Sequence, residues 1–147
     1  MHHFGDIICT NNMILSKNGI EKEIGKGNLS IEPNPIIKEA SVKVHLSNLY
    51  GKNMEKFEEI DSYVLKPKGF ILAKAKEILT LPDDIAAFYD GYIGVATKGL
   101  LTHGSSMFID PGGKWQITLE IFNASEKDIV LKNGMRVGQY IFMRIEK

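Results

Sequence analysis

The sequence contains a single cysteine, has no net charge and lacks any long apolar run, and each of these absences excludes a class of protein. Cys9 cannot form an intramolecular disulfide alone, so the fold needs no disulfide framework and a reducing compartment is favoured. Basic and acidic residues both number 18, so no overall field attracts nucleic acid or an anionic membrane. No stretch approaches the roughly 18 apolar residues of a membrane span. These features predict a cytoplasmic protein with neither nucleic acid nor membrane as a partner.

The N-terminal residues show no targeting or metal-binding pattern. Met1–Asp6 lacks the basic segment and apolar core of a secretory signal peptide. His2 and His3 are adjacent, but the other ligands of a coordination sphere do not accompany them, so we predict no metal site there. A length of 147 residues suits one domain. We therefore interpret residues 1–147 as a single domain in which residues 1–12 form an N-terminal extension.

One segment near the N-terminus has the features of a short helix. Ile20 and Ile24 are four residues apart and would share a helical face. Ser16 is a favourable N-cap residue, and Gly25 with Gly27 favours termination of the helix. The segment is predicted to pack one face against a sheet.

The rest of the chain has the character of short strands. In Ser41–Leu46, Val42, Val44 and Leu46 alternate with polar residues and would lie on one face. Similar runs follow at Ser62–Leu65, Phe70–Ala73, Glu77–Leu79, Tyr92–Ala96, Ser106–Ile109, Gln116–Asn123, Ile129–Leu131 and Val137–Ile145. Turn-forming sequences rich in Gly, Pro, Asn and Asp separate them. This pattern predicts an all-β sandwich, jelly roll or small barrel, with the charged Gly51–Glu59 as a surface loop.

Three blocks of the sequence resemble the dCTP deaminase family. The first extends over Met13–Val42, and the second over Leu81–His103. The third, Ile109–Gln139, is the most specific, because it contains an Asp-Pro-Gly turn and a Leu-Glu pair within a strand. That Leu-Glu pair is more similar to the deaminase branch than to typical trimeric dUTPases. The resemblance covers most of the chain.

The resemblance implies a fold, an assembly and a reaction. The fold is a distorted jelly roll, or β-clip, in the form of a dUTPase-like barrel with one short N-terminal helix. The assembly is a homotrimer with nucleotide sites between neighbouring subunits. The ligand is a deoxynucleoside triphosphate, dCTP or dUTP, held with Mg²⁺. The chemistry is hydrolytic deamination of dCTP to dUTP, or release of pyrophosphate from dUTP in the sister branch of this hydrolase superfamily.

Several residues match functional positions of the family, although each has a simpler structural interpretation. Glu120 matches the catalytic carboxylate, and it would face away from the core because Leu119 and its alternate neighbours are apolar. The alternative for Glu120 is simple solvation. Gln139, Asp110 and His103 match nucleotide-binding positions. Their alternatives are a hydrogen bond at a sheet edge, a turn-forming role and a structural histidine, respectively.

Other family positions have been replaced. The family has Gly-Arg-Ser-Ser where this chain has Gly followed by Tyr92–Gly94, and Thr97 occupies the position of a second arginine. Lys98 is one residue away and remains, with Thr97, a candidate nucleotide-binding residue. If this segment were a strand, Lys98 would point to the face opposite Thr97 and could substitute only if a bulge shifted the register. Lysine also lacks the bidentate fork of arginine.

Further differences leave the activity open. Lys43 reverses the charge of a family aspartate, and Trp115 replaces a small glycine and would fill part of the cleft or pack on the sheet. The sequence also ends without the tail that closes over the nucleotide in relatives. The alternatives are a divergent deaminase that uses Glu120, a non-catalytic trimeric nucleotide-binding or regulatory paralogue, and a dUTPase-like diphosphatase. A fourth alternative, supported by the missing arginines alone, is an enzyme that acts on a less phosphorylated pyrimidine.

Overall fold

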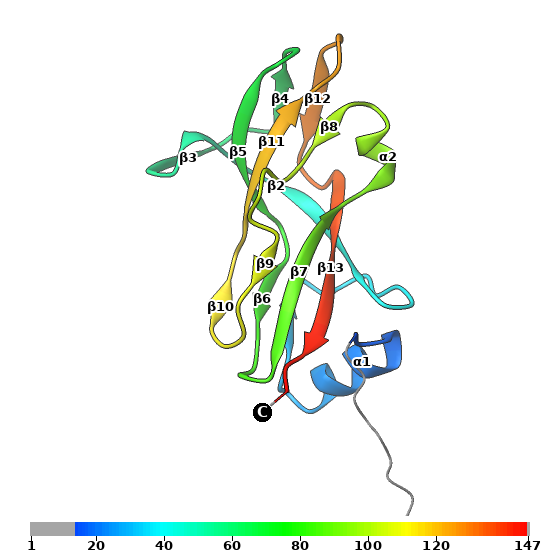
Figure 1. Ribbon diagram of the computed structural model, residues 1–147. Coiled ribbons are helices and arrows are strands. Elements are labelled where there is room, and N and C mark those ends of the chain that lie inside the picture. Colours follow the sequence, from blue (N-terminus) through cyan, green and yellow to red (C-terminus); the bar gives the residue numbers. More distant parts are fainter. Residues whose placement is uncertain (1–13, 147) are drawn as a thin grey trace, which may run out of the picture.

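A curled antiparallel sheet makes up most of the molecule, with a short helix packed at one end (Figure 1). The computed structural model describes residues 14–146. The predicted N-terminal extension, including His2, His3 and Cys9, lies outside the described residues. Within residues 14–146, no helix is long and apolar enough to cross a membrane.

Two helices and thirteen strands occur in the described part of the chain. They are α1 (Lys17–Gly25), β1 (Ser30–Glu32), β2 (Val42–Asn53), β3 (Lys56–Glu59), β4 (Ser62–Leu65), β5 (Phe70–Ala75), β6 (Ile78–Thr80), β7 (Ile85–Gly91), α2 (Ile93–Ala96), β8 (Leu100–Leu101), β9 (Phe108–Ile109), β10 (Lys114–Trp115), β11 (Thr118–Asn123), β12 (Ile129–Lys132) and β13 (Arg136–Arg144). The main sheet has the order β8-β11-β5-β2-β13-β7-β9, with β3 also paired to β2. Smaller sheets β1-β6-β10 and β12-β4 flank it.

The alternating pattern of β2 places its apolar side chains in the core, as predicted. Val42, Val44 and Leu46 are each 0% exposed. They pack with large side chains from other strands, among which Tyr140 and Phe142 of β13 are also fully buried. The all-β fold class predicted from the sequence is confirmed.

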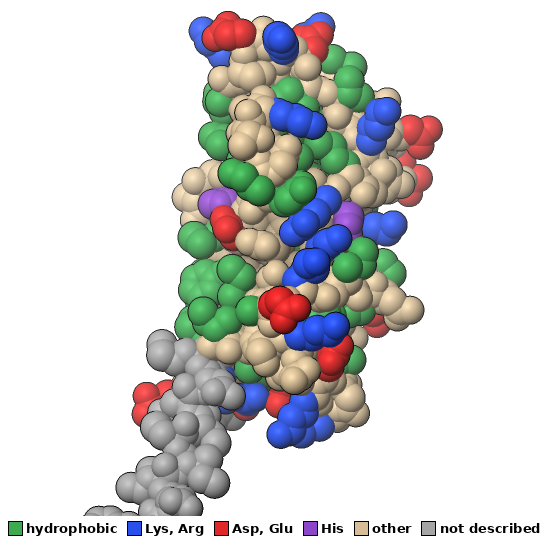
Figure 2. Space-filling model, turned by 90° about the vertical axis from the view of Figure 1, so that its right-hand side faces the viewer, with side chains coloured by type: hydrophobic (Ala, Val, Ile, Leu, Met, Phe, Trp, Pro, Cys, Tyr) green, Lys and Arg blue, Asp and Glu red, His purple; other side chains and the backbone are tan. Residues whose placement is uncertain are grey.

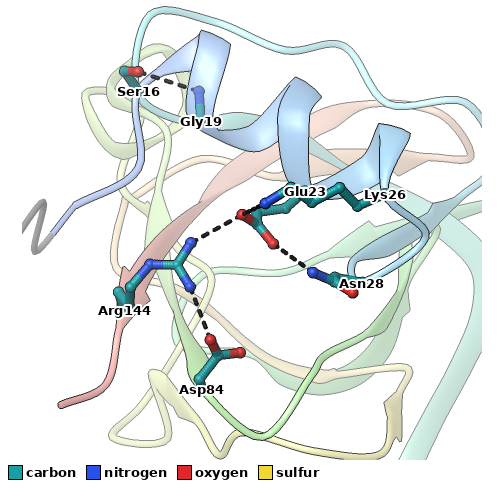
Figure 3. A network of polar contacts seen from close by, with 7 residues as sticks. All are labelled: Ser16, Gly19, Glu23, Lys26, Asn28, Asp84 and Arg144. Atoms are coloured by element: carbon teal, nitrogen blue, oxygen red, sulfur yellow. Dashed lines mark hydrogen bonds and ion pairs between the residues drawn. The ribbon is translucent and has the colours of Figure 1, made fainter. Parts of the chain in front are cut away.

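The N-terminal helix is also confirmed, and a polar network attaches it to the sheet (Figure 3). The hydroxyl oxygen of Ser16 caps α1 by accepting a hydrogen bond from the amide of Gly19 at 3.3 Å. Glu23, on the buried side of α1, accepts a hydrogen bond from Arg144 of β13 at 3.0 Å. Arg144 in turn donates to Asp84, just before β7, at 2.8 Å. The guanidinium therefore bridges the helix and two neighbouring strands.

The strand predicted at Tyr92–Ala96 is wrong, because the chain forms the short helix α2 there. After β7 ends, amides of this segment donate to carbonyls four residues earlier, such as Ala96 to Tyr92 at 3.0 Å. Only Val95 of α2 is buried, and Ile93 is 70% exposed. Only one side chain of α2 packs against the core, so the alternation of residue types at Tyr92–Ala96 does not correspond to the buried and exposed faces of a strand.

The surface loop predicted at Gly51–Glu59 is also wrong. β2 continues to Asn53, and β3 pairs with it as a hairpin. The side chains of β3 are largely exposed, so the hairpin leaves no alternating apolar pattern in the sequence. Strand β7 was missed for the opposite reason, since Ile85, Ala86 and Ala87 are all fully buried and show no alternation.

Candidate functional site

Glu120 lies on the face of β11 that points away from the core. Its neighbours Leu119 and Ile121 are fully buried, whereas Glu120 is partly exposed, as the sequence pattern predicted. One carboxylate oxygen, Oε2, accepts hydrogen bonds from the backbone amides of Gly104 and Ser105 at 2.7 and 3.2 Å. No hydrogen bond to Oε1 occurs among the described residues. The loop after β8 therefore orients the carboxylate and leaves one oxygen for a ligand.

Glu120 lines a cavity of about 550 Å³, which we call the carboxylate cavity. Phe70, Phe108 and Trp115 contribute aromatic surface to it, and Asp110 is also part of its lining. The structure therefore brings together two of the predicted site residues, Glu120 and Asp110. Trp115, for which the sequence left open a position in the cleft or packing on the sheet, also lines this cavity. An aromatic cavity with one oriented carboxylate suits a planar heterocycle.

A second cavity, of about 540 Å³, contains two other predicted residues, His103 and Gln139. It is also lined by Arg136, so we call it the arginine cavity. The guanidinium carbon of Arg136 lies 4.0 Å from the centre of the Tyr92 ring. His103 Nε2 lies 4.0 Å from Asp90 Oδ1. This cavity is lined by an arginine, whereas the lining of the carboxylate cavity contains no Lys or Arg side chain from the described residues.

The loop that follows β8 connects the two cavities. Its first residue, Thr102, is buried and accepts a hydrogen bond from the hydroxyl of Tyr89 at 2.8 Å. Burial raises the pKa of Tyr89, so the phenol stays protonated and remains a donor. The next residue, His103, faces the arginine cavity, whereas the amides of Gly104 and Ser105 hold Glu120. One short loop thus positions His103 in the arginine cavity and Glu120 in the carboxylate cavity.

Thr97 and Lys98 are not brought together with the other predicted residues within this chain. Thr97 ends α2, and its hydroxyl donates to the carbonyl of Ile93 at 3.0 Å. Lys98 lines a different cavity, of about 430 Å³, together with Lys127. Because α2 replaces the predicted strand, the argument that Lys98 faces the opposite side of a sheet does not apply.

Arg136 is the functional candidate that the residue-by-residue reasoning missed. It lies within the third block of family resemblance, three residues before Gln139, and a cation at that position was the available signal. The sequence could not show that Tyr92, from a distant segment, lies against its guanidinium.

Comparison with known proteins identifies the family. The family model described as dCTP deaminase-like matches residues 51–145. The chain belongs to the dCTP deaminase-like family. The dCTP deaminase, dUMP-forming, of Beutenbergia cavernae is 33% identical over 154 residues, which cover 90% of this chain and 80% of that protein. The resemblance inferred from the three sequence blocks is thus confirmed.

Solved structures show that this dCTP deaminase-like chain shares the dUTPase fold. The 2'-deoxycytidine 5'-triphosphate deaminase of Agrobacterium tumefaciens superposes with a TM-score of 0.74 at 19% identity, over 91% of this chain. The match covers 48% of that chain, so the present chain spans about half its length. A dUTPase variant from phage phi11 of S. aureus, described with a structural Mg(II) ion, gives a TM-score of 0.61 at 13% identity. The match covers 81% of this chain and 92% of that dUTPase chain.

Proposed function

We propose that this protein catalyses the hydrolytic deamination of dCTP to dUTP in pyrimidine deoxynucleotide metabolism, with Glu120 as the proton-transfer group. The observation that carries this proposal is the position of Glu120, held by two backbone amides in an aromatic cavity. The dCTP deaminase-like family model, and a relative named dCTP deaminase, dUMP-forming, support deamination of dCTP as the reaction type. A cytoplasmic location, predicted from the sequence, suits this role.

The geometry of Glu120 suits acid–base catalysis. Water attacks C4 of the cytosine ring while the carboxylate accepts a proton from that water. The carboxylate passes that proton to ring N3 and then carries the proton of the new C4 hydroxyl to the departing amino group, so that ammonia leaves and a carbonyl remains at C4. The amides of Gly104 and Ser105 fix Oε2 throughout, which leaves Oε1 for the proton transfers.

The remaining predicted residues would bind the nucleotide across a subunit boundary. We propose a homotrimer in which the arginine cavity of one subunit, with His103 and Gln139, approaches the carboxylate cavity of the next. Asp110 would contact the nucleotide on the carboxylate side. Thr97 and Lys98 line neither of these two cavities, so they would reach the nucleotide only through the assembly of subunits. Exposed apolar side chains on the outer face of the sheet support this assembly. They include Phe70 at 55%, Leu101 at 50% and Phe108 at 48% exposure.

Magnesium enters this proposal with the substrate. Within residues 14–146, no group of three or more His, Cys, Asp or Glu side chains is arranged to hold a metal ion. The described residues therefore do not fit a resident metal centre. Mg²⁺ commonly binds through phosphates and water with only one or two carboxylates, so it would accompany the triphosphate. No step of the proposed reaction depends on it.

The proposal is tested by incubating the protein with each deoxynucleoside triphosphate and Mg²⁺ while ammonia and pyrophosphate are measured separately. We expect dCTP to raise the melting temperature by mass action and to release ammonia. Pyrophosphate from dUTP without ammonia from dCTP would instead identify a dUTPase-like diphosphatase. Absence of both products would support a non-catalytic nucleotide-binding or regulatory paralogue, the alternative favoured by the Tyr92–Gly94 replacement.

A Gly104→Ala substitution tests whether the loop positions the catalytic carboxylate. A Cβ at residue 104 would occupy the space of Glu120 Oε2, so the carboxylate must move. We expect the turnover number to fall by about 10- to 100-fold, because a small displacement of a positioned catalytic group is costly. Gly25→Ala is the matched control, since nothing lies within 4 Å of a Cβ at residue 25. Equal activity of both variants would contradict this role of the loop.

A further inference from the structure

The guanidinium of Arg136 is a cation without an anionic partner in the described part of the chain. No carboxylate of residues 14–146 lies within 4.0 Å of it. Its Nε atom is buried and has no hydrogen-bond partner among these residues. Placing a charged donor away from water is unfavourable unless it is paired. The cavity beside Arg136 is therefore suited to an anion from outside the chain.

Tyr92 and Gly94 hold this guanidinium in place. The cation lies 4.0 Å from the centre of the Tyr92 ring, a distance typical of cation–π contacts. A Cβ at residue 94 would overlap the Tyr92 ring, so the glycine makes room for the ring to lie beneath Arg136. The replacements at residues 92 and 94 therefore form one structural unit with Arg136. A guanidinium held on a ring loses less conformational entropy on binding than a free side chain does.

Other polar groups of the arginine cavity also suit an anion. The side-chain oxygen of Gln139 accepts a hydrogen bond from Ser41 at 3.5 Å, which leaves its amino group available as a donor. His103 Nδ1 is buried without a partner among the described residues. Lys43 is the cross-strand neighbour of Gln139 and adds positive charge nearby. Figure 2, which shows the right-hand side of the molecule in Figure 1, has Lys and Arg side chains gathered near the middle of that face, between histidine side chains.

We propose that Arg136, supported by Tyr92, binds one phosphoryl group of the nucleotide. This inference rests on the proposed nucleotide function and names the group that replaces the lost Arg-Ser-Ser motif. Arginine can bind a phosphate through two parallel hydrogen bonds, and the amide of Gln139 adds a third donor. Among the described residues that line the arginine cavity, Arg136 is the one Lys or Arg side chain, because Lys98 and Lys127 line a different cavity and Lys43 lies outside the lining. The site thus recognises one phosphate strongly and gains little from further phosphates.

Isothermal titration with deoxycytidine, dCMP, dCTP and inorganic phosphate tests this subsite. For the unmodified protein we expect dCMP to bind roughly 10- to 100-fold more tightly than deoxycytidine, the effect of a charge-assisted contact. We expect the affinity for dCTP to exceed the affinity for dCMP by less than about tenfold. Inorganic phosphate should compete with dCMP.

The variants separate the subsite from general effects on the fold. Arg136→Gln should abolish the preference for dCMP over deoxycytidine, and Arg136→Lys should restore only part of it, because lysine lacks the planar fork. Tyr92→Leu should lower the affinity for dCMP but leave the affinity for deoxycytidine unchanged. Lys127→Gln, in the neighbouring cavity, is the matched control and should behave as the unmodified protein. Thermal unfolding of each variant verifies folding.

Two results would overturn the inference. The first is a preference for dCMP over deoxycytidine that is unchanged in Arg136→Gln, or absent in the unmodified protein. The second is binding that appears only with dCTP. Failure of the deamination proposal is a different outcome, since a protein that releases no ammonia can still show phosphate binding that depends on Arg136. Conversely, ammonia release with an unaltered Arg136→Gln variant would reject only the subsite.

Discussion

A Glu120→Gln variant is expected to deaminate dCTP roughly 100- to 10,000-fold more slowly than the unmodified protein, the usual contribution of a proton-transfer group. Glutamine has the same shape and can still accept hydrogen bonds from the amides of Gly104 and Ser105. It cannot accept a proton from water, so the chemical step should fail while the loop stays in place. The turnover number measured from ammonia release is the relevant quantity.

A surface substitution of the same kind provides the control for this prediction. Glu126 is an exposed carboxylate outside the lining of the carboxylate cavity, so Glu126→Gln should leave both activity and the melting temperature unchanged. The melting temperature of Glu120→Gln should also change little, because the side chain is partly exposed. Deamination at the normal rate by Glu120→Gln would remove Glu120 from the reaction.

An Arg144→Met variant is expected to lower the free energy of unfolding at neutral pH by about 1 to 3 kcal/mol. Glu23, whose side chain is 6% exposed, would lose its charged donor at 3.0 Å, and Asp84 would lose its donor at 2.8 Å. The Arg144 and Asp84 side chains are 35% and 37% exposed, so solvent screening reduces their part of the effect. Urea unfolding midpoints provide the measurement.

Lys26→Met is the matched control, because Lys26 also contacts Glu23, at 3.5 Å, but is 51% exposed. A change below about 0.5 kcal/mol is expected for it. The network should also weaken in acid. The hydrogen bond from Asn28, followed by that from Arg144, holds the pKa of Glu23 below its ordinary value of 4.5 despite burial. The stabilisation is therefore complete above pH 4.5 and is lost as the pH falls through the lowered pKa.

The difference in stability between the unmodified protein and Arg144→Met should accordingly narrow below pH 4.5. Protonated Glu23 interacts less favourably with the guanidinium, so at low pH the removal of Arg144 lowers the free energy of unfolding by a smaller amount. A difference that stays constant across this range would show that Arg144 stabilises the protein through packing alone.

The sequence by itself determined the features that depend on neighbouring residues. The N-cap at Ser16 and the spacing of Ile20 and Ile24 were sufficient to predict α1, because a helix is stabilised by contacts three and four residues apart. Strict alternation in β2 predicted its buried face for a similar reason. The orientation of Glu120 followed from its apolar neighbours, and the three blocks of resemblance indicated the family before any geometry was known.

Only the tertiary structure decided the features that join distant segments. The segment at residues 92–96 has an alternating pattern, yet it forms α2 because backbone hydrogen bonds within the turn and one core contact outweigh that pattern. The contact of Arg136 with Tyr92, and that of Glu120 with Gly104, depend on strand pairing and loop course. Such contacts leave no periodic signal, since each depends on a packing arrangement that no local run of sequence specifies. The sequence therefore predicted the scaffold and the orientation of the carboxylate, whereas the cation that we propose as a replacement for the missing arginines emerged only from the folded chain.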